Sequence, residues 1–261
     1  MRSRKGSIAI GIILLAAGIA TCVVSFVVLG FDPEKLANVQ FSENTYEVNE
    51  SFRDIEIKSS IEHVRFAVSS DGKCRVATYC PDTISAEAMV EDNCLKIRTV
   101  DEGGVKGHIG IFVTEPYITV YLPEKSYGSL QINQSFGKVS IPKGFTFTEA
   151  VIESTTGGVN VSADITDSVA IKTTTGDVLL RDVAVSGDMN ISCTTGEVQL
   201  EDCDASAITI KTSTGDVSGT LLTPKTFITD TSTGDIDVPD SEGEGSCEIS
   251  TTTGDIDISI R

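Results

Sequence analysis

The sequence predicts an all-β protein: a single-stranded parallel β-solenoid, or β-helix, with about 19–20 residues per coil, preceded by one N-terminal transmembrane helix. Three observations lead to this fold class. A motif of the form Thr-Thr-Gly-Asp followed by Val or Ile recurs through the second half of the chain. Val, Ile and Thr, which favour strands, dominate these segments, whereas aromatic residues make up only 6% of the 261 residues. A separate apolar run near the N-terminus carries no charge.

The first predicted elements are a short cytoplasmic tail (residues 1–7) and a transmembrane helix (residues 8–29). The apolar run is 22 residues long, and at 1.5 Å per residue it matches the roughly 30 Å hydrocarbon core of a bilayer. Basic residues precede it and the first acid is Asp32, so the N-terminus is expected in the cytoplasm. The sequence therefore predicts a single-pass protein of the cell membrane with an extracytoplasmic C-terminal domain.

Two other fates of this segment would also leave the rest of the chain outside the cytoplasm. The stretch Ile19-Ala20-Thr21-Cys22 resembles a bacterial lipobox, in which a lipidated cysteine becomes the N-terminus, although a smaller residue is usual at the place of Thr21. Ordinary cleavage of a signal peptide is the second. The apolar run continues seven residues past Cys22, which favours an uncleaved anchor.

Residues 30–40 form a predicted linker, and residues 41–130 a predicted irregular β cap with the first coils. Alternating segments such as FRDIEIKSSI and YITVYLP predict strands, and Asp71-Gly72 predicts the tip of a hairpin. A solenoid needs covered ends to stay soluble. This half is therefore expected to close one end of the core.

Residues 131–261 hold the regular repeats, whose glycines are spaced by 19 or 20 residues. Apolar and polar residues alternate before each glycine and the parity changes after it, which predicts two or three short strands per coil. A β-sandwich is the rival fold, but a sandwich does not require the same residue at a fixed period. Glycine suits a corner because it adopts positive φ without steric cost. The predicted corners are Gly137, Gly157, Gly176, Gly196, Gly215, Gly234 and Gly254.

The threonine before each glycine forms a predicted inward ladder, whose hydroxyls would bond one another and the corner backbone. Ice binding is an alternative role for threonine rows, but the outward row two residues before the glycine has charged neighbours, which fits ice poorly. The predicted ladder consists of Thr156, Thr175, Thr195, Thr214, Thr233 and Thr253.

An acidic residue follows most of these glycines, and a solvated corner is the simplest interpretation. Calcium is the sharper alternative, because that ion prefers hard oxygen ligands. No other cofactor is expected. The predicted ligands cluster near the C-terminus: Asp235, Asp237, Asp255 and Asp257.

Charge and motifs limit the function. Beyond residue 31 the chain carries 17 basic and 38 acidic residues, a net charge of −21, which would repel nucleic acid. The two histidines, His63 and His108, belong to no recognisable catalytic motif, and the chain has no Trp. We expect no enzyme but a binding or structural protein with a protein, peptide or cell-wall partner. The alternatives are a calcium-stabilised surface spacer and an enzyme acting on envelope polysaccharide.

Six cysteines lie beyond the apolar run, three in each half of the chain. An odd number in each half excludes a complete disulfide framework within either half. The sequence predicts mostly free thiols, with at most one bridge among Cys74, Cys80 and Cys94.

The repeats TTTGDV, CTTGEV, TSTGDV and TSTGDI, preceded by YITVYLP, resemble the bacterial β-strand-repeat family of "putative adhesins" of unknown function, also described as the toastrack domain. The resemblance covers about residues 45–261. It implies a β-helical, extracytoplasmic domain that acts in surface adhesion or in the response to cell-envelope stress. It carries no catalytic residues to transfer.

Overall fold

The computed structural model describes residues 14–21, 23–24, 27–28, 40–101 and 114–261. The predicted cytoplasmic tail, nearly all of the predicted linker and several residues of the predicted transmembrane helix lie outside these ranges. The described residues before position 29 are helical. Within the described ranges, no helix combines the length and hydropathy needed to cross a membrane.

The chain divides into two compact units. The first comprises Met1–Gln40 and Gly104–Glu115, and the second comprises Phe41–Gly103 and Pro116–Arg261. The second unit contains all the strands described here.

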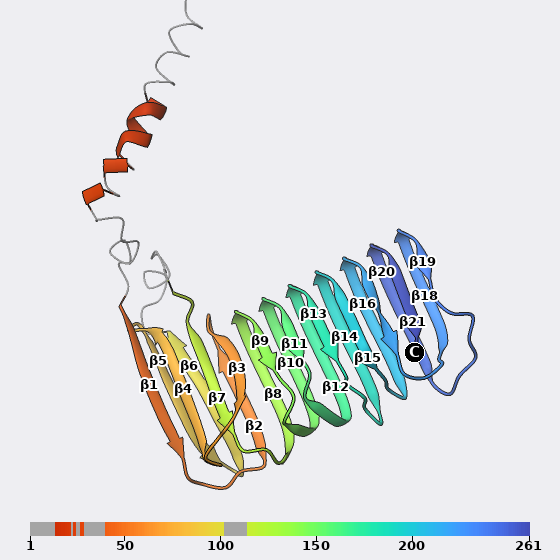
Figure 1. The fold of residues 1–261 in the computed structure, drawn as a ribbon, viewed down its shortest axis with the longest axis horizontal. Helices are drawn as coiled ribbons and strands as arrows, with labels where there is room; N and C mark the ends of the chain where they lie inside the picture. The colour runs from red at the N-terminus through yellow and green to blue at the C-terminus, as the bar shows by residue number, and fades with distance from the viewer. Residues whose placement is uncertain (1–13, 22, 25–26, 29–39, 102–113) are drawn as a thin grey trace, which may run out of the picture. The chain divides into compact units, whose positions relative to one another are not determined.

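Figure 1 shows these strands side by side along the second unit. Their bounds are β1 (Phe41–Val48), β2 (Asp54–Ser59), β3 (His63–Val68), β4 (Cys74–Pro81), β5 (Ile84–Glu91), β6 (Cys94–Asp101), β7 (Tyr117–Leu122), β8 (Ser126–Phe136), β9 (Val139–Ile141), β10 (Thr146–Thr156), β11 (Val159–Val161), β12 (Asp164–Thr175), β13 (Val178–Arg181), β14 (Asp188–Thr195), β15 (Val198–Cys203), β16 (Ala207–Thr214), β17 (Val217–Leu221), β18 (Thr226–Thr233), β19 (Ile236–Asp237), β20 (Ser246–Thr253) and β21 (Ile256–Ile260).

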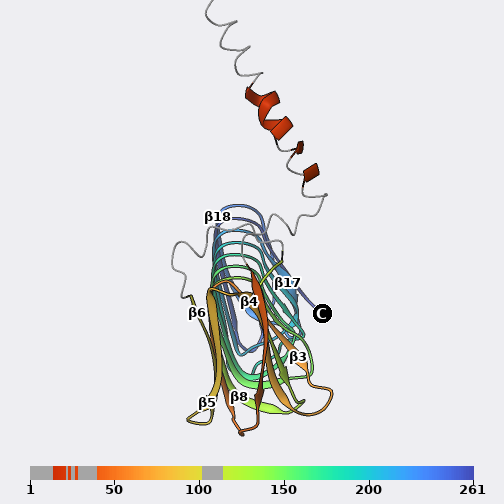
Figure 2. The same cartoon turned by 90° about the vertical axis from the view of Figure 1, so that its left-hand side faces the viewer.

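The strands form two sheets. Sheet A has eleven strands in the order β1-β4-β7-β3-β9-β11-β13-β15-β17-β21-β19. Sheet B has ten strands in the order β18-β20-β16-β14-β12-β10-β8-β2-β6-β5. From β8 onward each coil gives one strand to sheet B before its glycine and one to sheet A after it, and neighbouring coils pair in parallel. Figure 2 shows the coils stacked around a flattened core, so the all-β prediction is confirmed and the arrangement fits a β-solenoid.

The order of coils in space departs from their order in sequence at both ends. β20 and β21, the last strands of the chain, lie between the β16–β17 coil and the β18–β19 coil. At the other end, β2 and β3 lie between β8–β9 and β6–β7. The sequence predicted neither insertion, because equivalent repeats can pair in register with any other repeat.

The N-terminal end of the second unit is not wholly parallel. Three pairs, β1 with β4, β4 with β7, and β5 with β6, are antiparallel. These strands lie where the repeat is least regular in sequence. The edge strands of the two sheets meet here, where Tyr46 Oη of β1 donates to Ala86 O of β5 at 2.6 Å.

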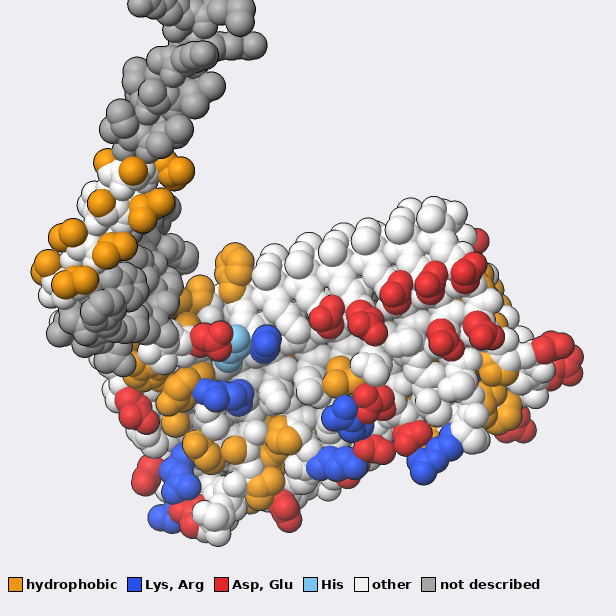
Figure 3. Space-filling view, turned by 45° about the horizontal axis from the view of Figure 1, so that its top comes forward, with side chains coloured by type: hydrophobic (Ala, Val, Ile, Leu, Met, Phe, Trp, Pro, Cys, Tyr) orange, Lys and Arg blue, Asp and Glu red, His pale blue; other side chains and the backbone are white. Residues whose placement is uncertain are grey.

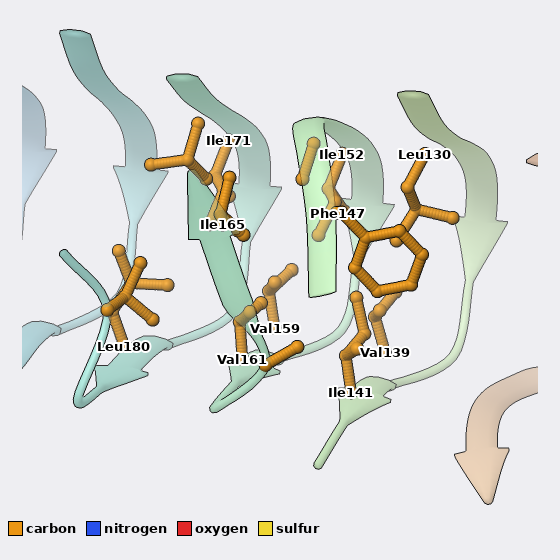
Figure 4. Packing of buried hydrophobic residues seen from close by; sticks show 14 of the residues in the cluster. Leu130, Val139, Ile141, Phe147, Ile152, Val159, Val161, Ile165, Ile171 and Leu180 are labelled. Carbon is orange, nitrogen blue, oxygen red and sulfur yellow. The ribbon is translucent and has the colours of Figure 1, made fainter. Parts of the chain in front are cut away.

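One continuous apolar core runs through the second unit. In the regular coils it consists mainly of Val, Ile and Leu from facing positions of the two sheets, such as Ile171 and Leu180 (Figure 4). Larger side chains fill the N-terminal part, where Phe145 and Phe147 are each 1% exposed. The ring of Phe66 packs against both, with centroids 6.1 and 6.2 Å apart, so this part of the core depends on aromatic side chains.

Glycine corners and a candidate ligand-binding groove

The seven predicted corner glycines all have positive φ, between 115° and 151°. Residues that carry a side chain rarely adopt this backbone conformation. Steric overlap excludes a side chain as well, because a Cβ on Gly157 would lie 1.8 Å from the carbonyl oxygen of Gly137 in the neighbouring coil. Backbone conformation and close contact between coils thus both require glycine at these corners.

The prediction that the threonine before each glycine points inward is wrong. All six predicted ladder residues, Thr156, Thr175, Thr195, Thr214, Thr233 and Thr253, are exposed, although they do stack in register. The ladder pairs Ser154 with Thr173 and then Thr156 with Thr175, and it omits the residue between them. This break in the alternation places both residues before the glycine on the outside.

The inward column lies three residues before the glycine, and its members are buried or half-buried: Ser154, Thr173, Cys193, Thr212, Thr231 and Thr251. Some of these side chains bond to corner carbonyls. Thr251 Oγ1 donates to Gly215 O at 3.3 Å and Thr231 Oγ1 donates to Gly254 O at 3.0 Å. The buried hydroxyls of Thr173 and Thr212 have no hydrogen-bond partner within the described part of the chain.

The acids after the glycines bond to the corner backbone of the next coil. Asp177 Oδ1 accepts from Glu197 N at 3.0 Å, and Asp255 Oδ1 accepts from Asp235 N at 2.8 Å. Figure 3 shows acidic side chains following one another along this edge toward the C-terminal end. The carboxylates therefore cap amides that the turn leaves exposed.

The predicted calcium ligands occupy two neighbouring coils, with Asp237 opposite Asp257, and all four are exposed: Asp235, Asp237, Asp255 and Asp257. In the described part of the chain, no three His, Cys, Asp or Glu side chains lie close enough together to hold a metal ion. The structure does not assemble the predicted site.

The six described cysteines are free thiols. Burial raises the pKa of Cys80 to about 12, with a further contribution from the carboxylate of Glu62. Burial likewise raises the pKa of Cys247 to about 12 and that of Cys203 to about 11. These thiols are neutral core side chains at physiological pH.

A groove on the outer face of sheet B was not predicted. Two rows of outward side chains cross β2, β8, β10, β12, β14 and β16, and the strand register places the members of each row side by side. Two adjoining hollows of about 410 and 270 Å³ lie over these rows and share Val151 and Glu153. The first row is Glu56, Gln131, Val151, Ala170, Asn190 and Thr209; the second is Lys58, Asn133, Glu153, Lys172, Ser192 and Lys211.

The chemistry of the groove is polar, with both charges present. Asn133 Nδ2 donates to Glu153 Oε2 at 3.0 Å, and Lys211 lies 3.8 Å from Glu248. Glu56 pairs with Lys58, whose hydrogen bond lowers the pKa of Glu56. Lys172 forms no ion pair with any described residue, so its ammonium group is available to a ligand.

One sequence signal could have pointed to the groove. The position six residues before the glycine is uncharged in six successive repeats, which hold Gln131, Val151, Ala170, Asn190, Thr209 and Ile228. Small side chains there deepen the sheet surface. The signal is weak, because such residues are ordinary on an outward strand face.

Comparison with known proteins gives the same fold. A "putative adhesin" from Bacteroides fragilis is similar over 84% of this chain and 97% of its own, with 16% identity and a TM-score of 0.50. A "putative cell adhesion protein" from Clostridium sporogenes is similar over 85% of this chain and 100% of its own, with 10% identity and a TM-score of 0.38. No curated protein matches this chain. The family model described as Toastrack DUF4097 matches residues 52–261, so the chain belongs to the Toastrack DUF4097 family.

Proposed function

We propose that this protein is a non-catalytic binding protein of the bacterial cell envelope that holds an extended polymer in the groove of sheet B. The groove carries the proposal. It crosses six strands, and at about 4.8 Å between strands it runs for roughly 24 Å without a deep pocket. A long shallow surface built from repeats suits a linear ligand better than a small molecule.

The lining of the groove favours a hydroxylated, weakly anionic polymer such as a cell-wall glycan. Asn133, Asn190 and Ser192 supply amide and hydroxyl groups that both donate and accept hydrogen bonds. Lys172 adds an uncommitted positive charge on a chain whose net charge is −18. Adhesin names among structures of the same fold are consistent with binding at a surface.

Membrane attachment through residues 8–29 is part of the same proposal, and the uncharged run of 22 residues supports it. If the proposal holds, the protein should stay with membranes after washing at high salt. Protease added to intact spheroplasts should degrade the second unit. Release by salt alone would contradict the anchor.

Binding can be tested with the full chain in detergent micelles, cosedimented with cell walls stripped of protein. The double variant Lys172→Ala, Lys211→Ala should bind at least about 10-fold more weakly, a loss of about 1.4 kcal/mol. Lys143→Ala is the matched control, because this exposed lysine pairs with Asp182 outside the groove. Equal binding by all three proteins, or no pelleting of the wild type, would refute the groove as the binding face.

A further inference from the structure

The β18–β19 coil ends the stack, and one of its edges has no partner strand among the described residues. β18 is the last strand of sheet B and β19 is the last strand of sheet A. Both pair only inward, with β20 and β21. The same coil thus leaves an open edge in both sheets.

The hydrogen-bonding groups of this edge can be assigned from neighbouring coils. In the interior, the amide of each corner glycine donates to the next coil, as Gly254 N does to Thr233 O at 2.9 Å. Gly234 is the corresponding glycine of the last coil, with no further coil beyond it. On β18, Thr226 N donates inward to Gly245 O at 3.1 Å. Because alternate residues of a strand face opposite edges, the amides of Phe227, Thr229 and Thr231 face the open edge.

The core is also uncovered at this end. Phe227 and Thr229 are half-buried, whereas Cys247 and Ile249, which hold the same positions in the next coil, are fully buried. Ile236 is 43% exposed, and Ile256 beside it is 1% exposed. A further strand would cover apolar surface as well as pair the free amides.

Charge restricts what can bind. From Thr226 to Ile260 the sequence holds nine acidic residues and no Lys or Arg. Lys225, the residue immediately before β18, is 3% exposed. Its Nζ lies 2.7 Å from Asp204 Oδ1, so its charge is already compensated. Two copies meeting at this end would bring like charges together, which opposes self-association.

We propose that the open edge of β18 is a strand-addition site for an extended cationic segment of another protein. Main-chain hydrogen bonds to β18 would supply affinity, as in other cases of strand addition. Apolar residues of the segment would cover Phe227 and Thr229 on the core side. Its basic residues, alternating with these, would lie on the outer face beside Asp230.

The test uses the full chain in detergent micelles and a fluorescein-labelled eight-residue peptide of alternating Lys and Val, followed by fluorescence anisotropy. A peptide of alternating Lys and Pro carries the same charge but cannot pair as a strand, and it should bind at least 10-fold more weakly. Thr229→Pro removes an open-edge amide and should weaken Lys–Val binding by a similar factor. Thr229→Val, which keeps the amide, should bind like the wild type.

Hydrogen exchange keeps the test decisive if Thr229→Pro fails to fold. In the wild type, bound peptide should slow exchange at Phe227, Thr229 and Thr231. Equal binding of the two peptides, or unchanged exchange at these amides, would reduce the interaction to charge attraction and overturn the proposal. End-to-end dimers in analytical ultracentrifugation that Thr229→Pro abolishes would also overturn it, in favour of a second copy as the occupant.

Discussion

The two ends of the solenoid close in different ways. At the N-terminal end, antiparallel strands form the edges of both sheets, and outward rings stack across β1, β4 and β7: Phe41 on Tyr79 at 5.0 Å and Tyr79 on Tyr117 at 5.5 Å. At the C-terminal end the last coil is another copy of the repeat. A stack that ends on a regular coil leaves the edge amides and the apolar core of that coil exposed. Covering the end therefore requires strands whose sequence departs from the repeat.

A buried polar network marks the closed end. Glu62 is 0% exposed, and its Oε2 accepts from the amides of Ser60 and Ile61, both at 3.0 Å, and from Thr99 Oγ1 at 3.1 Å. Its carboxylate also contributes to the raised pKa of Cys80 on β4. These bonds tie the turn between β2 and β3 to β6, although the other oxygen, Oε1, is buried with no hydrogen-bond partner among the described residues. The open end has a buried network of its own just before β18, where Lys225 Nζ lies 2.7 Å from Asp204 Oδ1 and donates to Thr223 Oγ1 at 2.8 Å, but this network does not cover the amides of β18.

The largest contrast is expected from removing one aromatic ring from the interior of the stack, on β10, and one from its open end, on β18. Phe147→Ala should lower the free energy of unfolding by about 3–5 kcal/mol, because the ring is fully buried. Phe227→Ala should cost only about 1 kcal/mol, since that ring is half-buried already. Urea unfolding followed by circular dichroism would measure both. Equal losses would mean that the C-terminal coil is as well packed as the interior of the stack.

Corner glycines offer a smaller contrast between an interior coil and the last one. In Gly176→Ala and Gly234→Ala the new Cβ would lie 2.3 and 2.1 Å from a neighbouring glycine oxygen. The interior coil is held on both sides, so we expect a loss of about 3 kcal/mol there and about 1–2 kcal/mol at the last coil, which can shift outward. Thr175→Ala, at an exposed position, is the control for urea unfolding and should change stability little. An equal cost at both glycines would show that the last coil is held as firmly as the interior.

Thiol labelling can compare local opening at the two ends. Cys80 and Cys247 are buried, and burial raises the pKa of both to about 12, so we expect labelling at pH 8 to require local opening. Cys247 lies beneath the last coil, and we expect it to react about 10-fold faster than Cys80, an opening difference of about 1.4 kcal/mol. Variants that keep Cys80 or Cys247 as the only one of the seven cysteines would give the rates. Faster labelling of Cys80 would reverse the comparison.

The same thiols predict how stability depends on pH. Their folded pKa lies above the ordinary value of 9.0, so the folded state holds protons that the unfolded state releases. The resulting contribution to the free energy of unfolding is complete below about pH 9 and is lost as pH rises toward 12. Thermal melts between pH 8 and 11 should fall less steeply for Cys247→Ala than for the wild type. Parallel curves would exclude this contribution.

The smallest contrast concerns two hydroxyls of the inward column. Thr251→Val breaks a hydrogen bond to Gly215 O and should cost about 1 kcal/mol. Thr173→Val replaces a buried hydroxyl that has no partner, and it should be neutral or slightly stabilising. Urea midpoints of the two variants would decide. A similar loss at Thr173 would mean that its hydroxyl has a partner after all.

Periodicity made the fold predictable, and breaks in periodicity made the rest hard to predict. The spacing from Gly157 to Gly254 predicted the coil length, the parallel stacking and the glycine corners. The prediction that Thr156 and its equivalents point inward was wrong. It assumed that the alternation continues up to the glycine, whereas the strand pairing skips one residue there. The groove forms where the outward residues of neighbouring strands are small. Small residues are also common on ordinary strand surfaces, so no local sequence pattern identifies the groove.

The insertion of β20 and β21 beneath the β18–β19 coil has a consequence for how the protein folds during synthesis. The ribosome releases β18 and β19 before β20 and β21, although the latter lie between β18–β19 and β16–β17 in the finished fold. Matching columns allow β18–β19 to dock on β16–β17 while synthesis continues, so the last strands must then displace it or arrive before it binds. Chains that stop near residue 245 would keep the outer coil but lose the one beneath it. Completion of the stack therefore waits for β20 and β21 to leave the ribosome.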